Sequence, residues 1–259
     1  MAVLTDPLVA EYAETGFVQS IPVLTPAEVH HYRIEVQQTI AAMGGHVTRF
    51  DAPHLYFRWA WDLATHPRVL DAMERLLGPN ILLKATRIFY KPAHSSSFVG
   101  WHQDGITERL EDAQVPAVWL GLTEATAENG CLRVVPRSHH LGLVPHANLP
   151  SPDNLTGDGA TAQTEIGAPW DVVMRAGEMS LHHPLVLHAS NPNHTDSPRI
   201  GFSVTYSATS LPDSQTAVAW VRGRGPAHRH EAVPPRYASL EEAVAAHRAA
   251  GHQLRRGAM

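Results

Sequence analysis

The chain has 259 residues, a formal net charge of −5 and 44% hydrophobic residues, which suits one domain with a sizeable core. The negative charge, without any block of Lys and Arg, argues against a nucleic-acid partner or an anionic membrane partner. The single cysteine, Cys131, excludes an internal disulfide and a cysteine-based zinc cluster. No apolar run approaches the ~18 residues of a membrane span, and the first ten residues lack a signal-peptide pattern, so we expect a cytoplasmic protein. Histidine is abundant, with 18 copies, and raises the question of a bound metal.

The first part of the chain carries helix punctuation. The predicted helices run from Asp6 to Gly16, from Thr25 to Met43 and from Pro67 to Leu77. Capping residues or prolines stand at their starts, and glycines follow their ends. The third segment also has its apolar residues at helical spacing. Residues 1–79 are therefore predicted to form a helical N-terminal part.

From Asn80 the pattern changes to short β-rich runs separated by turn residues. The predicted strands are Ile81–Tyr90, Val115–Leu122, Cys131–Val135, Val172–Met174, Met179–Leu181, Leu185–Leu187 and Ile200–Ala208. Many short strands with turn signals are typical of a sandwich, a jelly roll or a barrel. The polar segment 145–169 predicts a loop that shapes a pocket, because loops of this length in compact domains are usually functional.

A second capping box, Ser239–Glu242, predicts a short helix near the end of the chain. We find no internal repeat and no low-complexity tract. The whole chain, 1–259, is expected to form one domain. Within it we expect a β core over 80–210 and a C-terminal extension over 211–259.

The run Trp101–Asp104 contains the first candidate metal ligands. On an extended strand, residues i and i+2 point to the same face, so His102 and Asp104 would offer an imidazole and a carboxylate to one point. Such a pair makes up two of the three ligands in the 2-His-1-carboxylate triad of non-haem Fe(II) oxygenases. A chain with 18 histidines contains about one His-x-Asp triplet by chance, so a surface pair is the alternative interpretation of this motif alone.

The third candidate ligand lies further along the chain, where His188 ends an apolar run and precedes a turn-forming segment, 191–193. Arg199 follows at the start of a predicted strand whose inner face is apolar. A guanidinium aimed into a β-barrel needs an anionic partner, because an unpaired buried charge is costly. A dicarboxylate cosubstrate would suit it, since Arg binds a carboxylate through a two-bond fork. The alternatives are a core histidine for His188 and a structural salt bridge for Arg199.

Taken in order, these motifs resemble the phytanoyl-CoA dioxygenase family. The resemblance rests on Trp101–Asp104, on Ala127–His139 and on the block from Ala176 to Arg199, which contains His188 and Ser190. The opening pattern from Tyr12 to Glu28 is also similar, so the resemblance runs from about residue 10 to 210. One departure is Arg137, which stands where relatives often have glycine in a turn.

The resemblance implies a fold and a set of cofactors. The fold would be mainly β, a double-stranded β-helix (a jelly roll, cupin-like) with N-terminal helices packed on one sheet and a short C-terminal helix. His102, Asp104 and His188 would bind Fe(II). Arg199 would bind the distal carboxylate of the cosubstrate 2-oxoglutarate, and O2 would be the oxidant.

The resemblance also implies roles for residues around this centre. Ser190, Trp119 and Lys91 would lie beside 2-oxoglutarate. Arg87 shares a strand face with Lys91 and would reach the substrate or the cosubstrate. Gln103, between two metal ligands, would contact the substrate.

The implied activity is hydroxylation of an unactivated C–H bond in a small metabolite or natural-product intermediate, with release of succinate and CO2. Asp104 argues against halogenation, because related halogenases have Ala or Gly in place of this carboxylate. The alternatives are desaturation, cyclisation or epimerisation with the same cofactors, a jelly-roll metalloenzyme of another type, such as an isomerase, and a non-catalytic binding module. Arg199 argues against the other metalloenzyme, and the intact ligand set argues against the binding module. We expect a small-molecule partner and a monomer or homodimer.

Overall fold

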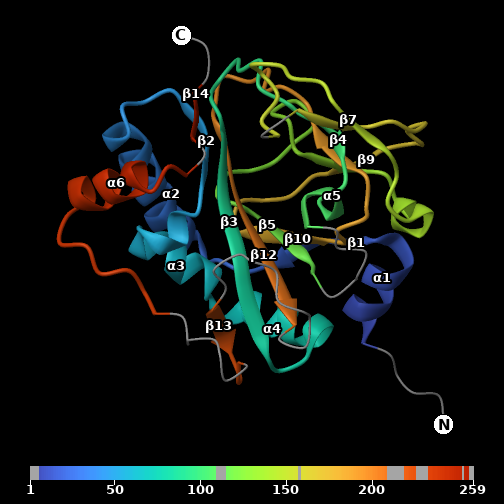
Figure 1. Ribbon diagram of the computed structural model, residues 1–259, viewed down its shortest axis with the longest axis horizontal. Coiled ribbons are helices and arrows are strands. Elements are labelled where there is room, and N and C mark those ends of the chain that lie inside the picture. The colour runs from blue at the N-terminus through green and yellow to red at the C-terminus, as the bar shows by residue number, and fades with distance from the viewer. Residues whose placement is uncertain are drawn as a thin grey trace.

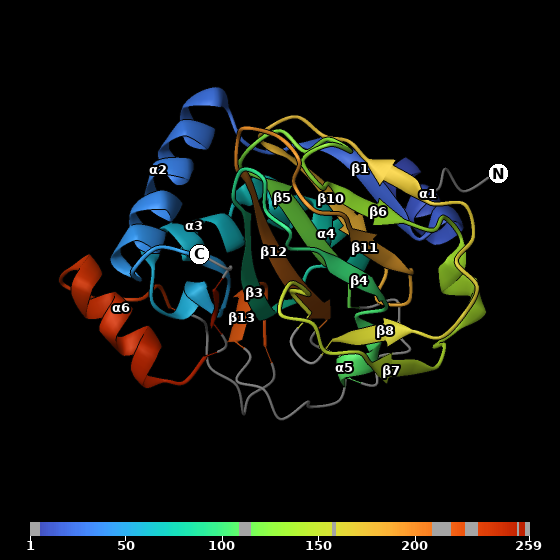
Figure 2. The ribbon, with the colours of Figure 1, turned by 90° about the horizontal axis from the view of Figure 1, so that it is seen from above.

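A computed structural model describes residues 6–108, 115–156, 159–208, 219–225, 233–252 and 254–256. Two antiparallel sheets face each other as a jelly roll, and helices lie on the outer face of the larger sheet (Figure 1). The view from above shows helices α2, α3 and α6 on one side of the larger sheet and strands of the smaller sheet on the other (Figure 2). The expected mainly β jelly roll, with N-terminal helices on one sheet and a short C-terminal helix, is confirmed.

The larger sheet follows the order β1-β10-β5-β12-β3-β2-β14, and β13 also pairs with β3. Its strands are β1 (Phe17–Pro22), β2 (Val47–Asp51), β3 (Ile81–Lys91), β5 (Ala117–Gly121), β10 (Glu178–His182), β12 (Arg199–Ala208), β13 (Ala219–Arg222) and β14 (Leu254–Arg256). The longest strands, β3 and β12, pair over almost their whole length, from Arg199 opposite Lys91 to Ala208 opposite Ile81. This ladder forms the rigid centre of the fold.

The smaller sheet has the order β4-β11-β6-β9. Its strands are β4 (Val99–His102), β6 (Leu132–Val134), β9 (Trp170–Val172) and β11 (His188–Ser190). The segment 145–169, expected to be a loop, contains a hairpin of β7 (His146–Asn148) and β8 (Ala160–Ala162). The amide of Gly100 on β4 donates to Asn154 Oδ1, which ties this segment to the smaller sheet.

The helices in the described residues are α1 (Pro7–Thr15), α2 (Pro26–Ala42), α3 (Arg58–Ala64), α4 (Pro67–Leu77), α5 (Gly105–Glu108) and α6 (Leu240–Ala249), with 3-10 turns at Pro53–Leu55 and Ser138–Leu141. The predicted caps are present: Asp6 accepts from the Leu8 amide, and Thr25 and Glu28 form the capping box. Gly16 ends α1 in the left-handed region, with a φ of 82°. No helix in these parts of the chain combines the length and the apolar character that a bilayer span requires.

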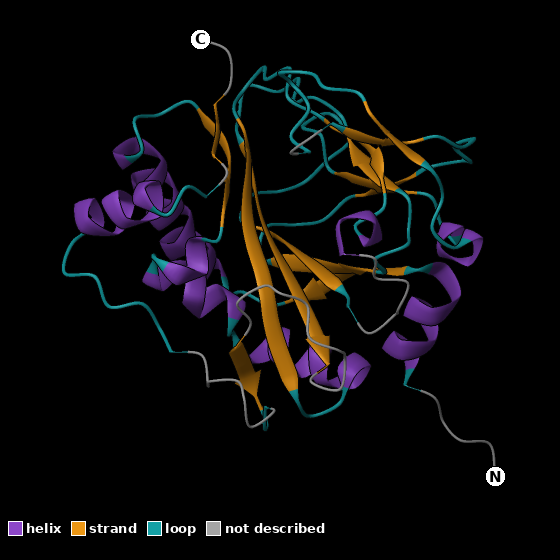
Figure 3. Cartoon of the chain, viewed as in Figure 1, coloured by secondary structure: helices purple, strands orange, loops and turns teal. Residues whose placement is uncertain are grey.

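Alternate residues of β12 divide the interior into two regions. Ile200, Phe202 and Val204 face outward and pack with the helices in the main hydrophobic core. Arg199, Ser203 and Thr205 face inward and line a cavity between the two sheets. Figure 3 shows most of the helices grouped against the outer face of the larger sheet and along its lower edge, while α1 and α5 lie to the right in this view. The site therefore lies on the inner face of the sheet, and the helices stabilise that sheet from the other side.

Three predictions of elements were wrong in detail. The N-terminal part is not purely helical, because β1 and β2 join the larger sheet through pairing with the distant strands β10 and β3. The run Leu185–Leu187 is buried but forms a turn, and the strand begins only at His188. The strand expected at Val172–Met174 lies at Trp170–Val172. Each error concerns a short segment whose state depends on pairing with residues far away in the sequence.

Arg137, which stands where the family pattern often has glycine, lies in a turn. Its φ of 69° is left-handed, the conformation that glycine adopts without strain. The side chain forms an ion pair with Glu14, at the end of α1. The chain therefore forms this left-handed turn with an arginine.

Candidate metal centre and cosubstrate pocket

Strand pairing brings the three predicted metal ligands together. His102 ends β4, His188 begins β11, and the two residues are directly opposite each other in the antiparallel ladder. Asp104 follows β4 by two residues, and its Oδ1 lies 3.6 Å from His102 Nε2 and 3.7 Å from His188 Nε2. One ligand atom from each residue lies within 4.8 Å of the other two. The donor set, two imidazoles and one carboxylate, is the one that Fe(II) oxygenases use.

Both histidine rings are held by the backbone in the orientation that a metal requires. His102 Nδ1 lies 2.9 Å from the Gly100 carbonyl oxygen, and His188 Nδ1 lies 3.0 Å from that of Val186. Since a carbonyl only accepts, each Nδ1 donates, and each neutral ring then presents the Nε2 lone pair to the centre. Burial lowers the pKa of His188 to about 3, which keeps this ring neutral at physiological pH. Both histidines can therefore bind a divalent metal through Nε2 without moving a proton from one ring nitrogen to the other.

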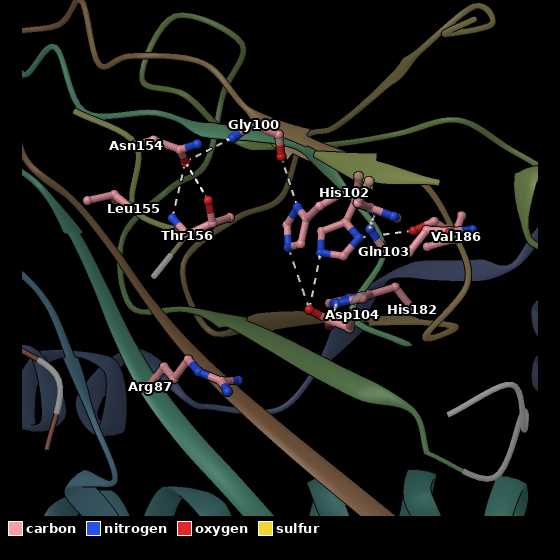
Figure 4. A network of polar contacts seen from close by, with 12 residues as sticks. Arg87, Gly100, His102, Gln103, Asp104, Asn154, Leu155, Thr156, His182 and Val186 are labelled. Atoms are coloured by element: carbon pink, nitrogen blue, oxygen red, sulfur yellow. Dashed lines mark hydrogen bonds and ion pairs between the residues drawn. The ribbon is translucent and has the colours of Figure 1, made fainter. Parts of the chain in front are cut away.

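Asp104 is surrounded by three histidines rather than two. His182, at the end of β10, places its Nε2 3.4 Å from Asp104 Oδ2, whereas His102 and His188 lie near Oδ1. Figure 4 shows the side chains of His102 and His182 directed at Asp104. A third histidine is thus placed to orient the carboxylate.

We expect His182→Phe to weaken Fe(II) binding about tenfold, because a buried partner that orients a ligating carboxylate typically contributes that much or more. His182→Gln keeps a donor near Asp104 and should restore most of the affinity. The measurement is an anaerobic Fe(II) titration of both variants, with the surface variant His31→Phe as control. Equal Fe(II) affinity in wild type and His182→Phe would show that His182 does not orient the carboxylate.

Arg199 faces the same cavity from β12. The residue is 2% exposed, its Nε has no hydrogen-bond partner, and it forms no ion pair in the described part of the chain. Burial lowers the pKa of its guanidinium to about 10, so the group remains charged at neutral pH. The guanidinium carbon lies 5.3 Å from the ring centroid of Trp119. A buried, charged and unpaired guanidinium beside a metal-binding triad fits a carboxylate ligand such as that of 2-oxoglutarate.

Gly201 allows Trp119 to take this position. A Cβ at residue 201 would lie 2.2 Å from Trp119 Cζ2, well inside any allowed contact. We expect Gly201→Ala to lower the free energy of unfolding by about 1–3 kcal/mol and to weaken 2-oxoglutarate binding, because the indole must move away from Arg199. Urea unfolding and 2-oxoglutarate titration measure the two effects. The double variant Gly201→Ala/Trp119→Leu should regain stability but not affinity, and a single variant as stable as wild type would contradict the argument.

Lys91 and Ser190 form a buried pair beside Arg199. Lys91 Nζ donates to Ser190 Oγ at 2.7 Å and to the Asn191 carbonyl, and burial, followed by the charge of Arg199, lowers the pKa of Lys91 well below its usual value. Ser190 lines the cavity, whereas Lys91 lies behind the wall. Since Ser190 Oγ accepts from Lys91, its own O–H is available to donate into the cavity. In this arrangement Lys91 reaches the cavity only through Ser190.

The two predicted substrate residues occupy different places. Arg87 lines the cavity, on the same face of β3 as Phe89. Gln103 is fully buried: its Nε2 donates to the carbonyls of Gly142 and Leu185, and its Oε1 accepts from the Val144 amide. Gln103 therefore binds the loops that flank the metal ligands, and only Arg87 faces the space where a substrate would lie.

Sequence reasoning missed several polar residues that line the cavity, among them His182 and Arg49. His182 is not singled out by any of the motifs identified in the sequence, although its place at the end of a strand before Pro184 is a local signal. Arg49 lies on β2, in a segment predicted to be helical, and it enters the cavity because β2 pairs with β3. No local pattern marks Arg49, since its role depends on pairing between strands about 40 residues apart.

A jelly roll with a 2-His-1-carboxylate triad and a buried guanidinium beside it defines the structural class of non-haem iron and 2-oxoglutarate proteins. The chain belongs to the phytanoyl-CoA dioxygenase (PhyH) family, whose model matches residues 12–201. The prediction of this family is confirmed, as is its cofactor set of Fe(II) and 2-oxoglutarate.

Similarity to individual proteins agrees with the family. The chain is 29% identical over 170 residues to a probable alpha-ketoglutarate-dependent hypophosphite dioxygenase of Stutzerimonas stutzeri, covering 62% of this chain and 57% of that protein. It spans about half the length of the curated relatives it matches. The structure of the non-heme monooxygenase ThoJ is 31% identical, with 94% of each chain covered and a TM-score of 0.79. The alpha ketoglutarate dependent epimerase SnoN, from nogalamycin biosynthesis, is 27% identical, with 90% of this chain and 92% of that chain covered and a TM-score of 0.64.

Proposed function

We propose that the protein is an Fe(II)- and 2-oxoglutarate-dependent oxygenase that hydroxylates an unactivated C–H bond of a small molecule. The main support is Arg199, a charged side chain that is 2% exposed and unpaired among the described residues. It lines the same cavity as the ligand triad. A metalloenzyme without an anionic cosubstrate has no use for such a group, because an unpaired buried charge destabilises the fold.

Each residue of the site has a defined task in this function. His102, Asp104 and His188 would hold Fe(II) on one side and leave its remaining positions open to the cavity. Arg199 would bind the distal carboxylate of 2-oxoglutarate, Trp119 would support the guanidinium, and Ser190 would donate a hydrogen bond. The chemistry supplied at such a centre is the conversion of 2-oxoglutarate and O2 to succinate and CO2, coupled to oxidation of a substrate C–H bond.

Two observations bear on the type of reaction. Asp104 fills the third ligand position, which favours oxygen transfer over halogenation. The similarity to SnoN, described as an epimerase, leaves epimerisation, desaturation and cyclisation as alternatives that use the same residues. A non-catalytic binding module is disfavoured, because the three ligands and the two backbone carbonyls that orient their rings are all in place. A cytoplasmic location and a monomeric or dimeric state stay predictions from the sequence.

Spectroscopy of the anaerobic protein tests the proposal without a known substrate. Wild-type protein with Fe(II) and 2-oxoglutarate should develop a weak visible charge-transfer band, and exposure to O2 should then yield succinate. Fe(II) with succinate in place of 2-oxoglutarate is the control and should give no band. If wild type shows neither the band nor succinate formation, the proposed function is wrong.

A further inference from the structure

Besides Arg199, two further arginines line the cavity, on strands β2 and β3. Arg49 and Arg87 both face inward, and Asp51 stands opposite Arg87 in the β2–β3 ladder. Figure 4 shows the Arg87 side chain reaching from its strand into the space below Asp104. The proposed binding of iron and 2-oxoglutarate leaves this part of the cavity without an occupant.

Asp51, the carboxylate beside these two arginines, is hydrogen-bonded to Arg49. The Nε and Nη2 of Arg49 donate to the two oxygens of Asp51, each at 2.9 Å, in a two-bond fork. Arg87 Nε lies 3.8 Å from Asp51 Oδ1, which is too far for a hydrogen bond. In the described part of the chain, two guanidinium groups therefore share one carboxylate, and Arg87 is the one without a hydrogen-bonded partner. Its side chain is 30% exposed, which leaves its donors accessible to a ligand.

Arg87 and Arg199 stand apart along the larger sheet. Arg199 pairs with Lys91, four residues from Arg87 on β3, and four residues of strand span about 13 Å. At the metal end, a divalent ion and Arg199 would offset Asp104 and the two carboxylates of 2-oxoglutarate. Lys91, whose pKa burial lowers well below its usual value, lies behind the cavity wall. The positive charge of Arg87 is thus available to bind an anion other than 2-oxoglutarate.

Resting on the proposed function, we infer that the substrate carries an anionic group, such as a carboxylate, which Arg87 binds. Apart from its charged residues and the metal ligands, the cavity is lined in part by apolar side chains, which include Phe89, Ile106, Val115 and Leu132. The substrate class is therefore a small organic anion with an apolar body, whose oxidised carbon lies away from its charged end.

Matched pairs of ligands test this inference. The probes are 4-phenylbutyrate and N-acetyl-L-leucine, each compared with its methyl ester, titrated into the anaerobic Fe(II)–2-oxoglutarate protein. Binding is followed by calorimetry and by the change in the visible band. We expect at least one acid to bind wild type about tenfold or more tightly than its ester, because a charge-assisted contact is lost in the ester. Arg87→Gln should remove this preference, and Arg87→Lys should keep part of it.

The controls separate this inference from the proposed function. Arg58→Gln removes the same charge from the exposed face of α3 and should leave the preference unchanged. Arg87→Gln should still show the band with Fe(II) and 2-oxoglutarate, which also reports correct folding. Absence of the band in wild type would count against the proposed function. An intact band, together with esters that bind as well as the acids, or with no binding of either, would overturn the role of Arg87.

Discussion

Replacing Arg199 by methionine should raise the melting temperature of the ligand-free protein and raise the KM for 2-oxoglutarate about 100-fold or more. The stabilisation is expected because methionine fills a similar volume and removes a buried guanidinium that has no partner among the described residues. The loss of affinity follows from the same change, since the distal carboxylate would enter the pocket without a counter-charge. The measurements are thermal unfolding with and without millimolar 2-oxoglutarate, and steady-state kinetics of succinate formation.

In this experiment 2-oxoglutarate should stabilise wild type but not Arg199→Met, because a ligand stabilises only the folded protein that binds it. Arg58→Met is the matched control, since this arginine is exposed and paired with Asp62 on α3. An unchanged KM in Arg199→Met would disprove the assigned role. A lower melting temperature would show that the guanidinium has a stabilising partner in the folded protein.

Replacing Asp104 by alanine should lower turnover about a thousandfold or more, because the metal loses its only anionic protein ligand and with it several kcal/mol of binding. His102 and His188 would remain in place, held by the carbonyls of Gly100 and Val186. We therefore expect a folded protein whose anaerobic visible band is absent. Fe(II) titration, circular dichroism and succinate formation together measure this outcome.

Two variants qualify this result. Asp104→Asn keeps the size of the side chain and removes its charge, so it should lose most of the Fe(II) affinity as well. Asp171→Ala removes a carboxylate that pairs with Arg133 outside the cavity and should keep wild-type turnover. If Asp104→Ala retains both the band and turnover, Asp104 is not a metal ligand.

The centre of the site was predictable because its residues are marked by local spacing. His102 and Asp104 lie two residues apart at a strand end, and His188 precedes a turn, so each carries a signal within a few positions. Arg199 was singled out as a charge at the start of an apolar strand, and the resemblance of the ordered motifs then joined it to these segments. The sheet pairing that brings His188 opposite His102 agrees with that expectation.

The rest of the cavity depends on contacts that no local pattern encodes. Arg49 and Asp51 reach the site only because β2 pairs with β3, and the region was predicted to be helical from the strong caps around it. Lys91 was expected beside the cosubstrate, but its position behind Ser190 depends on the twist and spacing of two different sheets. The helices were easier to predict, since capping residues such as Thr25 and Ser239 act within four positions.

The continuous β3–β12 ladder has a consequence for how this enzyme would acquire new specificities. Both basic groups, at Arg87 and at the Lys91–Arg199 pair, stand on this ladder, so their separation is fixed by backbone hydrogen bonds. The opposite wall is formed in part by Thr156 and Ala160, which belong to the segment between β7 and β8 and to the start of β8. Insertions and substitutions are tolerated in such connecting segments far better than in a central ladder. Variants selected for activity on larger or smaller anions should therefore carry their changes between residues 149 and 160, and leave the spacing of the two basic groups untouched.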